Sequence, residues 1–259
     1  TTGLRAGEWC GFGAPGEAPP DQRADDGCSL TFDSEILQER LEILGAPMAI
    51  LEVATNRPVA LVTVRLNDVA PEGTSARVTY GLLNLTHRDA HETPEPLEPG
   101  KRYVVTVTMN AIAHAFPAGH RVRFALSTCY WPIAWPAPQP VTLSVFTANS
   151  FVDLPMRAPD PSDSALRLFE SPERAASEVT ELRLAAVKRI VERDRATDET
   201  VYTISSAPGD LDSPELLHIK AIDLNVGYTL FKRFRIAEDD PAMAQAEVIH
   251  KTWFCRGGW

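Results

Sequence analysis

Residues 59–68 read VALVTVRLND, a short run in which Val, Leu and Thr predominate. Branched side chains of this kind favour the pleated β conformation because they pack well on a half-buried sheet. The run is bounded by Asn56-Arg57-Pro58 and Pro71-Glu72-Gly73, where proline presets φ and glycine accepts a positive φ. These signals predict a strand that begins and ends in turns.

Similar runs recur on both sides of this stretch. Residues 29–34 alternate apolar and polar side chains, a pattern typical of a half-buried strand. Further strands are expected at 41–45, 48–54, 77–85, 102–109, 121–127 and 141–146. A doubly wound α/β sheet would need helices between its strands, and no helical stretch separates these runs. Regular short strands with turn signals therefore predict an all-β fold built as an antiparallel sandwich.

Strand signals return after a proline-rich stretch that spans residues 150–172. We expect elements at 182–193, 200–205, 216–224, 228–236 and 242–254. The first of these is ambiguous, because its apolar residues also suit one face of a helix. We favour a strand over 183–193, since residues 195–199 then form a hairpin connection into 201–204.

These signals divide the chain into four parts. We expect an irregular N-terminal segment at 1–28, a sandwich domain at 29–150, a proline-rich connector at 151–175 and a β-rich extension at 176–259. The chain begins with Thr rather than Met, and its last strand-like run stops close to residue 259. We therefore expect a segment excised from a longer polypeptide, with the extension truncated at its C-terminus.

Composition limits the classes of partner. The 259 residues are 44% hydrophobic and 23% charged, which is typical of a globular protein with a sizeable core. A net charge of −10 opposes binding to nucleic acid and to anionic membranes. No apolar stretch approaches the length of about 20 residues that spans a bilayer, and residues at the start of the sequence lack the basic segment and apolar run of a signal peptide. Its four widely spaced cysteines are expected to be reduced thiols, and we expect a cytoplasmic protein.

Motifs for catalysis and metal binding are absent from the sequence. No Gly-x-Ser-x-Gly pentapeptide, which carries the nucleophile of α/β-hydrolases, occurs. His87 and His91 have a spacing that could bind a metal on a helix, but the proline-rich residues 93–96 follow them directly. We interpret both as loop histidines. We expect no catalytic residue, no metal and no cofactor.

The most unusual local composition is YWPIAWPAP at residues 130–138. A lectin-like interpretation would place Trp131 and Trp135 on a sugar-binding face. The alternative is a stiff aromatic connector that packs on a neighbouring surface, because an indole buries a large area and proline keeps the segment extended. We favour packing.

Several motifs in a fixed order carry a family resemblance. They are DQR at 21–23, LTF at 30–32, LEILG at 41–45, RLNDVAPEGTS at 65–75, LNLTHRD at 83–89, PLEPG at 96–100, IAHAFPAGHR at 112–121 and the two Trp-Pro pairs at 131–136. Their order and spacing over residues 21–148 resemble the C-terminal domain of X-prolyl dipeptidyl peptidases, cocaine esterase and related acylases, the CocE/NonD hydrolases. Residues 175–259 resemble only the less distinctive extension of some larger members.

The resemblance implies a jelly-roll, galactose-binding-domain-like β-sandwich with an additional antiparallel β extension. It also implies a parent serine hydrolase, of dipeptidyl-peptidase or esterase type, whose Ser-His-Asp triad lies upstream of this chain. We therefore expect a non-catalytic accessory domain that packs on the α/β-hydrolase domain of the same polypeptide and is inactive alone. Asp21, Arg23, Trp131 and Trp135 are the candidate interface residues. The alternative is a carbohydrate-binding jelly-roll module, and a homo-oligomer is left open.

Overall fold

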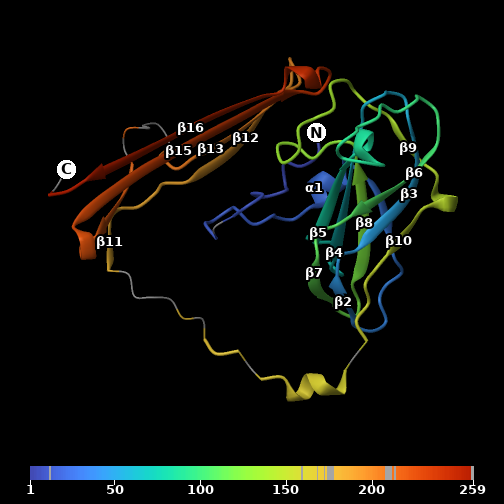
Figure 1. The fold of residues 1–259 in the computed structure, drawn as a ribbon, viewed down its shortest axis with the longest axis horizontal. Helices are drawn as coiled ribbons and strands as arrows, with labels where there is room; N and C mark the ends of the chain where they lie inside the picture. Colours follow the sequence, from blue (N-terminus) through green and yellow to red (C-terminus); the bar gives the residue numbers. More distant parts are fainter. Residues whose placement is uncertain are drawn as a thin grey trace. The chain divides into compact units, whose positions relative to one another are not determined.

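The computed structural model describes residues 1–11, 13–158, 160–167, 169–171, 173, 178–207, 212 and 214–257. Antiparallel strands dominate it, which confirms the predicted all-β sandwich (Figure 1). The chain divides into two compact units, Thr1–Ala158 with Asp239–Ala242, and Pro159–Glu238 with Met243–Trp259. The predicted boundary at residues 175–176 lies outside the described residues.

The first sheet of the first unit has the strand order β1-β8-β4-β5. Its strands are β1 (Leu30–Asp33), β8 (Arg121–Ser127), β4 (Leu61–Val69) and β5 (Ser75–Asn84). All neighbours are antiparallel. The run that predicted the fold therefore forms a central strand, with a partner on each edge.

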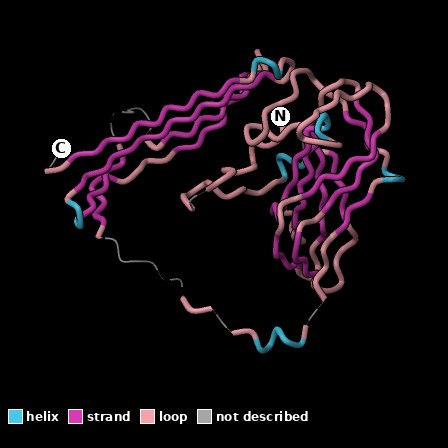
Figure 2. The backbone as a smooth tube through the Cα atoms, viewed as in Figure 1, coloured by secondary structure: helices cyan, strands magenta, loops and turns pink. Residues whose placement is uncertain are grey.

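The second sheet has the order β10-β3-β6, with β9 also paired to β3. These strands are β10 (Phe151–Asp153), β3 (Met48–Thr55), β6 (Tyr103–Thr108) and β9 (Leu143–Val145). A separate antiparallel pair joins β2 (Leu41–Gly45) to β7 (Ile112–Phe116). Figure 2 shows these strands gathered into one sandwich.

The core lies between the two sheets. Val62, Val64 and Leu66 alternate along β4 and are completely buried. They belong to the same cluster as Leu51 and Val53 of β3. Burying one such side chain stabilises a fold by about 1.5–3 kcal/mol, so this cluster is the main source of stability for the sandwich.

Helical turns among the described residues are short. One α-helical turn, α1 (Arg23–Asp26), interrupts the irregular N-terminal segment. The 3-10 turns are η1 (Leu85–His87), η2 (Thr147–Asn149), η3 (Pro161–Ala165), η4 (Lys220–Ile222) and η5 (Pro241–Met243). No described helix is long and apolar enough to cross a membrane.

Three features of the sandwich differ from the sequence-based expectation. The expected half-buried strand β1 is exposed at all four residues, because it is an edge strand. Strand β7 was not predicted, since its sequence IAHAF is short and two alanines weaken the strand signal. Strand β10 lies inside the predicted connector and pairs with β3.

The second unit contains one six-stranded sheet with the order β11-β14-β15-β13-β12, and β16 pairs with β15. The strands are β11 (Val179–Arg183), β12 (Lys188–Asp194), β13 (Glu199–Ser205), β14 (Glu215–Ile219), β15 (Leu224–Ala237) and β16 (Gln245–Cys255). Strands β12 and β13 form the predicted hairpin, and the helical alternative for this region is wrong. The strand expected at 183–193 is divided, since residues 184–187 connect β11 to β12.

Candidate functional site: an interaction surface on the sandwich

A buried ionic network fixes the N-terminal segment on the first sheet. The side chain of Arg65, on β4, has no exposed area, and its Nη1 lies 3.0 Å from Oδ1 of Asp26. Arg65 also donates to Oε1 of Gln22 at 3.2 Å and to Oγ of Ser29 at 2.8 Å. Burying an arginine is costly unless its charge is paired, and here residues 22–29 supply the partners.

The second carboxylate oxygen of Asp26 extends this network across the sheet. It accepts hydrogen bonds from Oγ of Ser75 at 2.7 Å and from Nη1 of Arg123 at 3.2 Å. Arg123 in turn donates two 2.7 Å bonds to the carboxylate of Asp33. These bonds hold the pKa of Asp33 below its usual value, despite some burial. Asp26, Ser75, Arg123 and Asp33 are thus bonded to one another.

Asp25 binds the first residues of the chain through its carboxylate. Its Oδ2 accepts the backbone N–H groups of Gly3 and Arg5, each at 3.1 Å. Burial raises the pKa of this carboxyl, against the opposing effects of Arg65 and the two N–H donors. Residues 1–6 are therefore a packed part of the domain.

Two of the predicted interface residues, Asp21 and Arg23, lie together at the surface. Nε of Arg23 donates to Asp21 at 2.7 Å, and the Arg23 side chain is 62% exposed. This hydrogen bond lowers the pKa of Asp21, and the other oxygen of Asp21 accepts the backbone N–H of Ser75. The pair is accessible, but Arg23 already has a carboxylate partner.

The two predicted tryptophans have different environments. Trp131 is fully buried, and its backbone N–H donates to the carbonyl of Thr2. Gly3 has a φ of +111°, and a Cβ there would lie 2.6 Å from Trp131 backbone atoms, so glycine permits this close approach. Trp135 is 54% exposed. Trp131 therefore has no surface with which to contact a partner, which corrects its place in the predicted interface.

A cluster of three titratable side chains was not identified from the sequence. Asp68, on β4, accepts hydrogen bonds from Nε2 of His114 at 3.0 Å and from Nδ1 of His120 at 2.7 Å. The histidines come from β7 and from the turn before β8, so tertiary structure alone brings them to Asp68. No described hydrogen bond joins a serine or cysteine to either imidazole, and the cluster consequently lacks the nucleophile of a catalytic triad.

His87 and His91 lie near each other, with ring centroids 5.5 Å apart. His87 belongs to the short turn η1 and His91 to the following loop, as their loop interpretation requires. Among the described residues, no three His, Cys, Asp or Glu side chains gather into a potential metal site.

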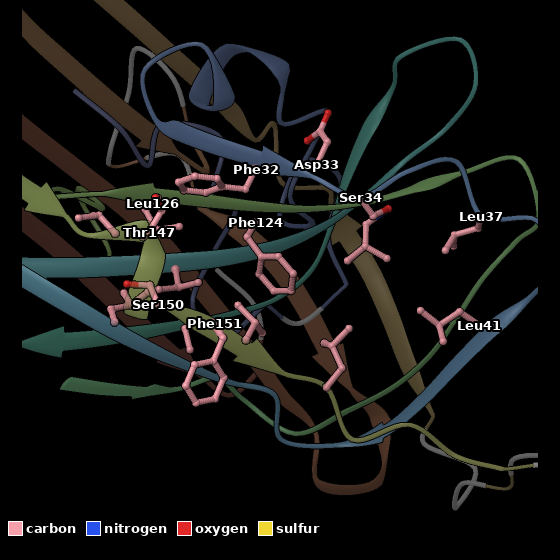
Figure 3. Close-up of a pocket in the computed structure, with 17 residues that line it drawn as sticks. Phe32, Asp33, Ser34, Leu37, Leu41, Phe124, Leu126, Thr147, Ser150 and Phe151 are labelled. Atoms are coloured by element: carbon pink, nitrogen blue, oxygen red, sulfur yellow. The ribbon is translucent and has the colours of Figure 1, made fainter. Parts of the chain in front are cut away.

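An apolar cavity of about 510 Å³ lies between the two sheets of the sandwich. We call it the seam. Figure 3 shows the rings of Phe32, Phe124 and Phe151 around it. Its other lining residues are Asp33, Ser34, Leu37, Leu41, Ala49, Leu51, Val64, Val122, Leu126, Val145, Thr147, Ser150, Val152 and Leu154.

The lining of the seam is mostly apolar, and it has few polar groups that could bind a ligand. Its one ionised lining residue, Asp33, is held by Arg123, and two of its three lining hydroxyls, Ser34 Oγ and Ser150 Oγ, donate to the carbonyls of Glu35 and Phe146. Phe32 and Phe151 are nevertheless 38% and 60% exposed. An open apolar cavity of this size, with its carboxylate and two of its hydroxyl groups already bonded, suits an uncharged apolar group.

Only part of the seam could be predicted from the sequence. The alternation in residues 29–34 predicts a strand there, and Phe32 of that strand lines the seam. Nothing in the local pattern shows that β1 lies at an edge, or that Phe151 belongs to a strand of the opposite sheet. Both facts depend on the order of strands in the sheets.

Comparisons with known proteins agree with this architecture. Residues 3–171 match the family described as "X-Pro dipeptidyl-peptidase C-terminal non-catalytic domain". The cocaine esterase of Rhodococcus sp. (strain MB1 Bresler) is 28% identical over 122 residues, which are 47% of this chain and 21% of the esterase. The chain therefore spans about a fifth of the length of this curated relative.

Solved structures show the same fold. An α-amino acid ester hydrolase aligns with a TM-score of 0.51 and 28% identity, over 53% of this chain and 27% of the hydrolase. An aminopeptidase from a marine sediment Thaumarchaeota archaeon has the same TM-score at 20% identity, over 58% of this chain and 30% of its own, and shares the fold. The family match covers more than half of the chain, and this protein therefore belongs to the X-Pro dipeptidyl-peptidase C-terminal non-catalytic domain family.

Proposed function

We propose that this chain is an accessory domain that packs on the α/β-hydrolase domain of a longer serine hydrolase and helps to shape that domain. The observation that carries the proposal is the match of residues 3–171 to a domain family described as non-catalytic. The exposed apolar surface of the sandwich supports it, because large exposed apolar patches are typical of interaction sites. Asp21, Arg23 and Trp135 stay in the proposed interface, since each is accessible.

The chain by itself is expected to be inactive. The sequence has no Gly-x-Ser-x-Gly motif, and no described hydrogen bond joins a serine to His114 or His120, which both bond to Asp68. The Ser-His-Asp triad of the proposed enzyme would be supplied by the hydrolase domain. We retain a cytoplasmic location in this proposal, because all four cysteines are free thiols.

The carbohydrate-binding alternative loses its main support in the structure. That alternative required two indoles, those of Trp131 and Trp135, on one sugar face. Trp131 is fully buried, so only Trp135 of the pair can meet a ligand. We therefore do not propose a lectin-like function.

The test compares this 259-residue chain with the longer polypeptide that would carry it. Hydrolysis of p-nitrophenyl acetate and of glycyl-prolyl p-nitroanilide would be measured for both, after repeated purification. We expect turnover by the longer polypeptide and none by the chain alone. Chemical cross-linking with mass spectrometry should also join the sandwich to the hydrolase domain. Turnover by the purified chain, or no cross-link between the two domains, would contradict the proposal.

A further inference from the structure

The seam opens between two edge strands, one from each sheet. Strand β1 pairs with β8 alone, and β10 pairs with β3 alone, among the described strands. Both strands line the seam, β1 through Phe32 and β10 through Phe151. The cavity is therefore flanked by two sheet edges that can still accept a neighbour.

The ladder shows which main-chain groups of β1 are free. The N–H of Ser34 donates to the carbonyl of Val122, and hydrogen-bonded pairs recur at every second residue of an antiparallel ladder. The main-chain groups of Thr31 and Asp33 therefore point away from β8. No described hydrogen bond engages these groups, and both residues are exposed. This edge presents donors and acceptors next to an apolar cavity.

Two of the usual protections of a sheet edge, lysine or proline residues and a β-bulge, are missing here, although both strands are short and each carries one aspartate. Residues 30–33 of β1 and 151–153 of β10 contain neither lysine nor proline, and their pairings show no register shift. Leu30 is 49% exposed and Phe151 is 60% exposed. An edge that lacks lysine, proline and a β-bulge and exposes apolar side chains favours the addition of another strand.

We propose that the seam receives an extended apolar segment of the hydrolase domain, which pairs with the outer edge of β1 and inserts alternate side chains between the two sheets. This inference rests on the proposed function and names its docking surface. Strand addition combines main-chain hydrogen bonds with pockets that receive every second side chain. Here the free edge of β1 provides the hydrogen-bonding groups, and the seam provides the pocket. A small apolar molecule would fill the cavity but would leave the strand edge unused.

The inserted side chains are uncharged. The seam contains no free charge that could pair with an ion, because the carboxylate of Asp33 is bound by both Nε and Nη2 of Arg123. A charged side chain would lose its hydration there without gaining a partner. We therefore expect every second side chain of the docked segment to be apolar.

The experiment measures how accessible the seam is in this chain and in the longer polypeptide. Phe151→Cys places a thiol at the mouth of the seam, and Val104→Cys is the matched control. Val104 is 69% exposed on β6, the opposite edge strand of the same sheet. Iodoacetamide labelling would be followed by peptide-resolved mass spectrometry, which separates the new thiols from the native cysteines.

We expect labelling of the Phe151→Cys thiol to slow at least about tenfold in the longer polypeptide, while labelling of the Val104→Cys thiol stays unchanged. Amide hydrogen exchange of residues 30–34 should slow there as well, because strand addition gives the free N–H groups partners. Both substitutions are at exposed positions and are expected to preserve the fold.

Each other result overturns the inference in a distinct way. Equal labelling at position 151, with inter-domain cross-links elsewhere, removes the seam as docking surface and leaves the proposed function intact. No inter-domain cross-link at all overturns both. Protection of the thiol without protection of the amides rules out strand pairing. Binding of N-phenyl-1-naphthylamine to the longer polypeptide, lost in Phe151→Ser, would assign the seam to a small apolar molecule instead.

Discussion

Strands β4 and β16 have similar shares of apolar residues but very different burial. Eight of the nine residues of β4 are buried, whereas no residue of β16 is. Strand β4 has partners on both edges, the second sheet on one face and residues 22–29 on the other. Strand β16 is an edge strand of a single sheet. The number of covering layers, rather than local composition, decides burial.

The same difference separates the two units. The sandwich has a continuous buried cluster, while in the described part of the second unit the buried apolar side chains are Ile204, Ala207 and Ile236. Exposed apolar side chains, such as Val248 and Phe254, are spread over its sheet. Hydrophobic burial is the dominant stabilising term in folding, so we expect the sandwich to be the more stable unit.

The largest expected effect comes from the buried ionic network. Arg65→Ala removes the fully buried partner of Asp26 and should cost about 3–5 kcal/mol, because a buried charge then loses its main pairing. Urea unfolding at pH 7, followed by circular dichroism, measures the loss. The control is Arg235→Ala in the second unit, where the ion pair with Glu199 is at the surface and a much smaller effect is expected. Equal losses of stability for the two substitutions would contradict the expectation that the buried ion pair contributes more than the exposed one.

Intermediate effects are expected from a matched pair of valines. Val62→Ala in the completely buried interior of β4 should destabilise the sandwich by about 2 kcal/mol, through lost burial and a residual cavity. Val248→Ala, at a side chain that is 59% exposed on β16, should stay within about 0.5 kcal/mol. The same unfolding measurement serves both variants. A comparable loss at Val248 would show that a partner covers the second sheet in solution.

The smallest effect concerns pH. The folded-state pKa of Asp33 is lowered by Arg123, so the ion pair stabilises the fold above the unfolded pKa of about 4, and this contribution is lost as pH falls through the folded pKa. Asp33→Asn should cost about 1 kcal/mol at pH 7, and the difference from the unsubstituted chain should shrink below about pH 4. Thermal unfolding across pH 3–7 measures this trend.

In the second unit, Glu199→Gln is the substitution that corresponds to Asp33→Asn. The pKa of Glu199 is likewise lowered by its hydrogen bond to Arg235, but that pair is exposed to solvent. Solvent screens such a pair, so we expect its substitution to leave the pH dependence of unfolding nearly unchanged. A larger change in the pH dependence of unfolding for Glu199→Gln than for Asp33→Asn would contradict the expectation that the partly buried pair contributes more.

Local signals in the sequence were sufficient for most of the strands. The β-branched runs at 48–54 and 59–68 became β3 and β4, and residues 195–198 became the turn between β12 and β13. Such signals are local because strand propensity and turn formation depend on neighbouring residues. Short strands without strong signals, β7 and β10, were missed for the same reason.

The candidate site could be predicted only in part. Exposure of Asp21 and Arg23 agrees with their place in a predicted interface, although their role there is still a prediction. Trp131 was assigned to the same surface, because the sequence does not show that residues 1–6 cover it. The seam was not predicted, since it requires β1 and β10 to be edges of two different sheets.

The sequence by itself determined that the chain is all-β, that it belongs to the X-Pro dipeptidyl-peptidase C-terminal domain family and that it carries no Gly-x-Ser-x-Gly nucleophile motif. Those conclusions rest on patterns within a few tens of residues. The tertiary structure decided that Arg65 is buried with Asp26, that Asp68 joins His114 to His120, and that the seam lies open. Each of these depends on strands distant in the sequence becoming neighbours, and no local propensity encodes that pairing.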